Sequence, residues 1–113
     1  YKGDLKRGDV LESEASIVVI GDVNHGARVI AKGNIVILGS LHGSAYAGAA
    51  GNASAVVMAM EMVPMQVRIA DFSTLPEDKG KKLGKGPVIA SAQDDSIIVR
   101  PIRKSFLNYL NFI

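Results

Sequence analysis

A six-residue repeat runs through the first half of the chain and limits the folds that it can adopt. Written in sixes, residues 17–52 read IVVIGD, VNHGAR, VIAKGN, IVILGS, LHGSAY and AGAAGN. The first column is apolar throughout: Ile17, Val23, Val29, Ile35, Leu41 and Ala47. The fifth column holds only small residues: Gly21, Ala27, Gly33, Gly39, Ala45 and Gly51. A fixed period of this kind is the signature of a repeat architecture.

Three hexads make a longer repeat. Residues 17–34 and 35–52 align without gaps and share Ile17/Ile35, Val18/Val36, Gly21/Gly39, Ala27/Ala45, Ala31/Ala49, Gly33/Gly51 and Asn34/Asn52. The pattern predicts stacked coils with three six-residue sides, in which first-column side chains point inward and small residues fit the crowded corners. We therefore predict an all-β fold, a short three-sided β-helix (β-solenoid) over residues 1–102. An antiparallel sandwich would also give short strands, but it does not predict this register.

After residue 52 the hexads become less regular, although strands continue. Alternation within residues 53–70 predicts one face that carries Val56, Met58, Met60 and Met62. The polar, glycine-rich segment 73–86 indicates an exposed loop. Short strands are expected around residues 88–90 and 97–99, with a turn at the adjacent carboxylates of residues 94 and 95.

Residues 103–113 are predicted to form a separate apolar and basic tail. Pro101 breaks the preceding strand, and a short helix would place Phe106, Leu107, Leu110 and Ile113 on one side. Two hypotheses stay open. The tail docks on a partner or a lipid surface, or it packs across an open end of the solenoid to cover its core.

Groups suited to catalysis or metal binding are sparse. There is no cysteine, and His25 and His42 lack the further ligands that a metal site needs. The GKKLGKG loop lacks the spacing and the Ser or Thr of a phosphate-binding loop. A net charge of +2 does not favour nucleic acid, and no apolar run approaches the ~18 residues of a membrane span. We predict a cytoplasmic, non-enzymatic protein with no metal or other cofactor.

The stretch GDVNHGARVIAKGNIVILGSLHGSAYAGAAGN, residues 21–52, resembles the C-terminal domain of the bacterial septum inhibitor MinC. The resemblance continues through VRIAD (67–71) and SIIVRPI (96–102). It implies a right-handed β-helix that forms a homodimer and binds the membrane-associated ATPase MinD. Binding would recruit a division inhibitor peripherally to the inner face of the membrane. Inhibition of FtsZ ring assembly would come mainly from an N-terminal domain outside this sequence.

The same resemblance suggests where the ATPase binds. Family members carry an Arg-Ser-Gly-Gln motif before the first coil, and this chain has Lys6, Arg7, Gly8 and Asp9 there. Only the glycine is identical, although a basic residue is kept at the first position. We predict a partner-binding site made of this segment and a neighbouring polar face. Its residues are Lys6, Arg7, Gly8, Asp9, Arg28, His42 and Ser44.

A second surface is predicted from strands that are apolar without alternation. Residues 17–20 and 35–38 read IVVI and IVIL. Unbroken apolar strands indicate burial on both faces of a sheet, and an exposed apolar stripe is an association site. We predict a homodimer interface formed by the four outward side chains, Val18, Ile20, Val36 and Leu38.

Two other classes share the repeat. Hexapeptide-repeat acyltransferases fold as left-handed β-helices and use a histidine base, but they usually have more coils than the hexads here allow. Bactofilin-like scaffolds are β-solenoids that polymerise end to end. Handedness would separate the first class from the septum inhibitors, and the formation of filaments would separate the second.

Overall fold

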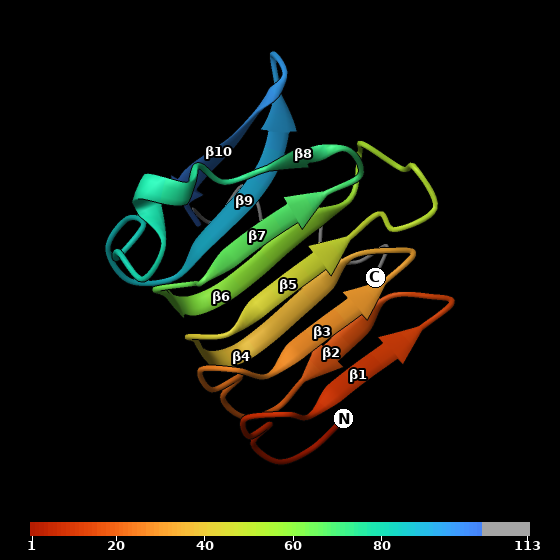
Figure 1. Ribbon diagram of the computed structural model, residues 1–113, viewed down its shortest axis with the longest axis vertical. Coiled ribbons are helices and arrows are strands. Elements are labelled where there is room, and N and C mark those ends of the chain that lie inside the picture. Colours follow the sequence, from red (N-terminus) through yellow and green to blue (C-terminus); the bar gives the residue numbers. More distant parts are fainter. Residues whose placement is uncertain (103–113) are drawn as a thin grey trace.

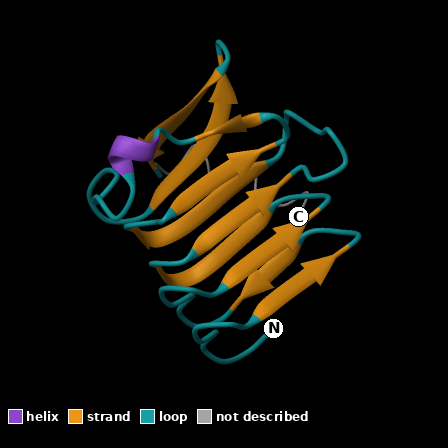
Figure 2. Cartoon of the chain, in the orientation of Figure 1, coloured by secondary structure: helices purple, strands orange, loops and turns teal. Residues whose placement is uncertain are grey.

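The computed structural model describes residues 1–102 and confirms the all-β solenoid (Figure 1). In chain order the strands are β1 (Val10–Ser13), β2 (Ile17–Val19), β3 (Arg28–Ala31), β4 (Ile35–Leu41), β5 (Ser44–Ala47), β6 (Val56–Met62), β7 (Gln66–Ile69), β8 (Phe72–Ser73), β9 (Val88–Gln93) and β10 (Ser96–Pro101). One short 3-10 turn, η1 (Pro76–Asp78), lies beside the strands in this part of the chain (Figure 2).

The chain winds as a right-handed coil with three sides (Figure 1). The first sheet has the order β1-β3-β5-β7-β8, and the second has the order β10-β9-β6-β4-β2. The third side is built from isolated bridges that stack Leu5 on Val23 and Val23 on Leu41. The strands of successive coils are parallel in both sheets. Right-handed winding distinguishes this solenoid from the left-handed acyltransferase type.

The predicted interior is confirmed. All six first-column residues are buried, and they belong to one continuous core cluster. Within β4, Ile35 and Ile37 point into this core, whereas Leu38 is 45% exposed. The chain then bends at Gly39, so that Leu41 enters the core again from the third side. A single strand therefore contributes to two sides, as six-residue periodicity requires.

The register agrees with the 18-residue repeat only as far as the pair of Val23 with Leu41. Ile17 pairs with Ile35, and Val10 pairs with Arg28. Beyond that point Val29 pairs with Ala45, so the gapless alignment of Ala27 with Ala45 is wrong as a structural equivalence. The His42–Gly43 turn is shorter than the corresponding 24–27 turn, and the 48–55 loop is longer than a hexad corner. Sequence identity at the small residues did not reveal these two changes in length.

The alternation predicted for residues 53–70 is also broken. Met58 and Met60 face outward, but Met62 belongs to the interior cluster. The register between β4 and β6 shifts between Ile37 and Ser40, which places Met62 beside Leu41 on the third side. The four residues therefore do not share one face, because β6 bends around the same corner as β4.

Antiparallel strands end the coil. β8 turns back along β7, and the β9–β10 hairpin extends the second sheet beside β6. Asp94 and Asp95 form the hairpin turn with positive φ values of 52° and 63°, which confirms the predicted turn. The predicted 73–86 loop is largely exposed and contains η1. The predicted tail, residues 103–113, lies outside the described residues.

Candidate partner-binding site

The Lys6–Asp9 segment forms a closed turn. The Asp9 Oδ2 atom accepts a hydrogen bond from the Lys6 backbone N–H at 2.8 Å, and the Asp9 N–H donates to the Lys6 carbonyl at 2.8 Å. Gly8 has φ = 91°, a left-handed conformation that glycine adopts without steric cost. The Asp9 carboxylate therefore caps its own turn, and the side chains of Lys6 and Arg7 stay exposed.

This turn stacks on the 24–27 turn of the next coil. The Gly8 N–H donates to the Gly26 carbonyl at 3.0 Å, and the Arg28 N–H donates to the Asp9 carbonyl at 2.9 Å. A Cβ atom on Gly26 would lie 2.6 Å from Arg7 Cγ, so the glycine provides the space in which the arginine stem packs. Gly26 was not predicted as a site residue, although its spacing from Gly8 equals one coil of the repeat.

Arg28 and Ser44 lie next to each other on the outer side of the first sheet. They are paired in register across β3 and β5, and Ser44 pairs in turn with Gln66 of β7. All three line a hollow of about 520 Å³. Its other lining residues are His25, Gly26, Ala27, Met65, Ser73, Thr74, Leu75, Pro76 and Lys79. Arg28 and Lys79 give this hollow two cations beside the exposed Lys6–Asp9 turn.

His42 is not part of this hollow. Its Nε2 atom lies 3.7 Å from Glu61 Oε1, a residue at the end of β6. Both side chains are roughly half exposed. The structure therefore brings Arg28 and Ser44 together but separates His42 from them, because the tight 42–43 turn directs this side chain toward the third side.

A second row on the first sheet was missed by the sequence analysis. Tyr46 of β5 and Arg68 of β7 are in register, and the guanidinium carbon lies 4.3 Å from the ring centroid. The Arg68 Nε–H also donates to the Ala70 carbonyl at 2.9 Å. Stacking on the ring holds Arg68 over the sheet. Tyr46 and Arg68 are 22 positions apart and not 18. This longer offset could not be inferred from the hexads, which are irregular in that region.

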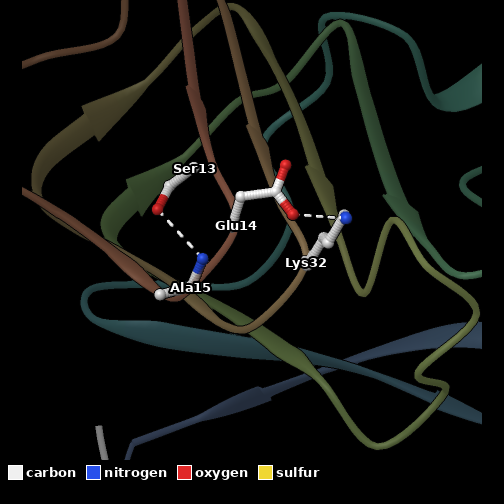
Figure 3. Close-up of polar contacts among 4 residues, drawn as sticks. All are labelled: Ser13, Glu14, Ala15 and Lys32. Carbon is white, nitrogen blue, oxygen red and sulfur yellow. Dashed lines mark hydrogen bonds and ion pairs between the residues drawn. The ribbon is translucent and has the colours of Figure 1, made fainter.

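The opposite corner of the solenoid carries a different polar cluster (Figure 3). Ser13 Oγ accepts a hydrogen bond from the Ala15 N–H at 3.0 Å. The Lys32 ammonium pairs with Glu14 of the preceding coil. The Glu14 side chain is 85% exposed, so water screens this ion pair and it contributes little to stability.

The outer side of the second sheet is apolar over most of its width. Val18, Ile20 and Leu38 are 38%, 52% and 45% exposed, as expected for outward side chains. Val36 is also on this side, between Val18 and Met58, but it is only 6% exposed. The expectation that Val36 is open to water is therefore wrong, whereas its predicted dimer role stays a prediction.

Within residues 1–102, no group of three His, Asp or Glu side chains is placed to hold a metal ion. In the same residues no helix has the length and apolarity to cross a membrane. The described surface instead offers a cationic hollow on one sheet and an apolar side on the other. These features define the class of the protein, a short β-solenoid with surfaces suited to protein association.

Comparison with known proteins gives the family. The family model described as "Septum formation inhibitor MinC, C-terminal domain" matches residues 1–102. A "Probable septum site-determining protein MinC" from Lachnospira eligens is 43% identical over 117 residues, covering 96% of this chain and 48% of the relative. Another from Agathobacter rectalis is 42% identical, covering 96% and 49%. The chain belongs to the family of MinC C-terminal domains.

A solved structure agrees in fold. A chain described as "MinC:MinD cell division protein complex, Aquifex aeolicus" superposes with a TM-score of 0.80 at 32% sequence identity. The match covers 99% of this chain and 93% of that chain. This chain spans about half the length of the curated MinC relatives named above.

Proposed function

We propose that this domain binds a MinD-type ATPase and thereby positions an inhibitor of septum formation. The carrying observation is the match to a chain from a MinC:MinD complex over nearly the whole of this sequence. Recruitment by that ATPase would bring the protein peripherally to the inner face of the membrane from the cytoplasm. Inhibition of FtsZ assembly would then depend on a further N-terminal domain. The domain itself acts by binding and not by catalysis.

The proposed ATPase-binding site is the Lys6–Asp9 turn with the adjoining hollow. Lys6 and Arg7 are exposed on the turn, and Arg28 and Lys79 line the hollow beside it. Four cations in this region suit an acidic surface on the partner. Arg7 can form two parallel hydrogen bonds to one carboxylate, a geometry common in interface hot spots. Asp9 has a different task, because its carboxylate closes the turn that presents the two cations.

The test is capture of purified MinD-type ATPase, with ATP present, by the domain and by its variants. The double substitution Lys6→Ala with Arg7→Ala should weaken binding by at least about thirtyfold, the equivalent of about 2 kcal/mol. The matched control is Lys81→Ala with Lys82→Ala, which removes the same charge from exposed positions in the 73–86 loop. If both double variants lose the same affinity, the effect comes from overall charge and not from this site. If the variant with Lys6→Ala and Arg7→Ala binds as tightly as the unmodified domain, the proposed site is wrong.

We further propose a homodimer through the apolar side of the second sheet. Val36 is a poor test position because it is already buried in a single chain, so a charge there would disturb folding. Leu38 is 45% exposed and serves better. Leu38→Glu should give monomers by light scattering at concentrations where the unmodified domain is dimeric, because burying an unpaired carboxylate is costly. Val10→Glu, at a residue 51% exposed on the first sheet, is the control and should stay dimeric.

A further inference from the structure

The apolar side of the second sheet is unevenly exposed. One row crosses the sheet in register, from Val18 through Val36 and Met58 to Ile89 of β9. The two central members are 6% and 5% exposed. The neighbouring row is open to solvent, with exposed fractions of 52% for Ile20, 45% for Leu38 and 45% for Met60. The centre of this side is therefore covered and its margin is not.

Neither the solenoid core nor a second copy accounts for this burial. Val36 and Met58 lie outside the interior cluster, because the residues on either side of them in β4 and β6 point inward: Ile35, Ile37, Val57 and Ala59. The exposed fractions are those of a single chain, so dimer formation is not their cause. The cover must come from the same polypeptide.

The chain leaves the described fold next to this row. Pro101 at the end of β10 pairs with Val88, which pairs with Ala59 of β6. The Ile102 N–H then donates to the Pro87 carbonyl at 3.0 Å. The exit point is therefore level with Ala59, the residue between the outward-facing Met58 and Met60. Whatever follows Ile102 starts at one margin of the apolar side.

The sequence that follows has the length and composition to cross it. From β10, where the chain leaves the sheet, Val36 of β4 lies three strand spacings away, or about 14 Å. The eleven residues 103–113 reach about 16 Å as a helix and roughly 36 Å when extended. Six of these residues are large and apolar or aromatic: Phe106, Leu107, Tyr109, Leu110, Phe112 and Ile113.

We propose that residues 103–113 dock on the outer side of the second sheet of their own chain, over Val36 and Met58. The tail would thus become the middle of the apolar surface, and Val18, Ile20, Leu38 and Met60 would remain at its edge for a second copy. This inference deepens the proposed dimer, because both use the same side of the solenoid. It differs from packing across the end of the solenoid, where β8, η1 and the β9–β10 hairpin surround a separate hollow of about 550 Å³.

A tryptophan reporter tests the docking, since the chain contains no tryptophan. In the Phe106→Trp variant the fluorescence emission of the tryptophan should be blue-shifted, and acrylamide should quench it only weakly. Adding Met58→Asp should shift the emission to the red and raise quenching severalfold, while circular dichroism confirms that the sheet is folded. Ser44→Asp on the first sheet is the matched control and should change neither. Emission typical of a solvent-exposed indole in Phe106→Trp alone would overturn the proposal.

Cysteine pairing locates the tail, since the chain has no cysteine of its own. Val36→Cys is combined in turn with a cysteine replacing Phe106, Leu107, Leu110 or Ile113, and the products are analysed after mild oxidation. At least one pair should form a disulfide within a single chain. The same tail cysteines are also paired with Leu83→Cys, because Leu83 lines the hollow at the solenoid end. Disulfides that form only with this cysteine, or only between two chains, would overturn the proposal.

Light scattering on the Phe106→Trp protein separates this inference from the proposed dimer. A buried indole in a monomeric protein would support the docked tail and refute the dimer. An exposed indole in a stable dimer would support the dimer and refute the docked tail. Flotation with anionic vesicles, lost on deletion of residues 103–113, would assign the tail to a lipid surface and would also overturn its docking on the sheet.

Discussion

Gly39 offers a direct test of how closely the coils stack at their corners. A Cβ atom at this position would overlap the Gly21 carbonyl oxygen and would lie 2.6 Å from Asp22 Oδ1. The same Oδ1 atom accepts a hydrogen bond from the Ser40 N–H at 2.8 Å. A methyl group can therefore be added only if two coils separate locally and this hydrogen bond lengthens. Gly39→Ala is the perturbation that we propose.

The cost follows from these contacts. Overpacking of a close backbone contact typically costs about 1–3 kcal/mol. Weakening a partly buried hydrogen bond adds about 1 kcal/mol, and the lower entropy of the unfolded alanine chain returns roughly 0.4–1 kcal/mol. We expect a net loss of about 2–3 kcal/mol in the free energy of unfolding. For a domain of this size that corresponds to a fall in Tm of roughly 10–20 °C.

The assay is urea and thermal unfolding followed by circular dichroism, with Gly51→Ala as the control. Gly51 has φ = +100°, but a Cβ atom there would meet no atom within 4 Å. Only the left-handed backbone conformation opposes alanine at this position, at about 1 kcal/mol. If Gly39→Ala destabilises the domain no more than Gly51→Ala, then steric crowding does not explain the small residues in the fifth column.

Two further substitutions test other parts of the fold. Leu41→Ala removes a fully buried side chain that stacks between Val23 and Met62 on the third side. It should reduce the free energy of unfolding, measured by urea titration, by about 2–5 kcal/mol. A reduction below about 1 kcal/mol would show that the third side is not part of the core. Lys32→Ala breaks the exposed ion pair with Glu14 and should change the free energy of unfolding by less than about 0.5 kcal/mol in the same titration. A larger reduction would mean that this ion pair contributes to the stability of the coil.

The interior could be predicted from the sequence because one periodic rule determines it. Ile17, Ile35 and the other first-column residues are buried as predicted, since each coil repeats the same inward direction. Val36 shows the limit of that rule. Alternation placed it correctly on the outer side of the sheet, but its burial depends on what covers that side, which periodicity does not describe.

The candidate site was predicted less completely, for geometric reasons. Gly8 and Asp9 form a turn, and a glycine followed by a capping carboxylate is a local signal for such a turn. Arg28 and Ser44 are adjacent, but they are 16 positions apart and not 18, because the 42–43 turn is tight. The same tight turn separates His42 from them. Arg68 was missed because it reaches Tyr46 only through the register between β5 and β7, after the long 48–55 loop.

That long loop shows how the solenoid tolerates changes in length. Residues 51–54 are all exposed, and β6 resumes the stack on β4 directly after this loop. Residues added in this loop do not change which side chains of the next coil point inward. An insertion within a strand would shift the later side chains of that strand from one face of the sheet to the other. Evolutionary insertions should therefore accumulate at 51–54, and an epitope or fluorescent label placed there should be carried without loss of the fold.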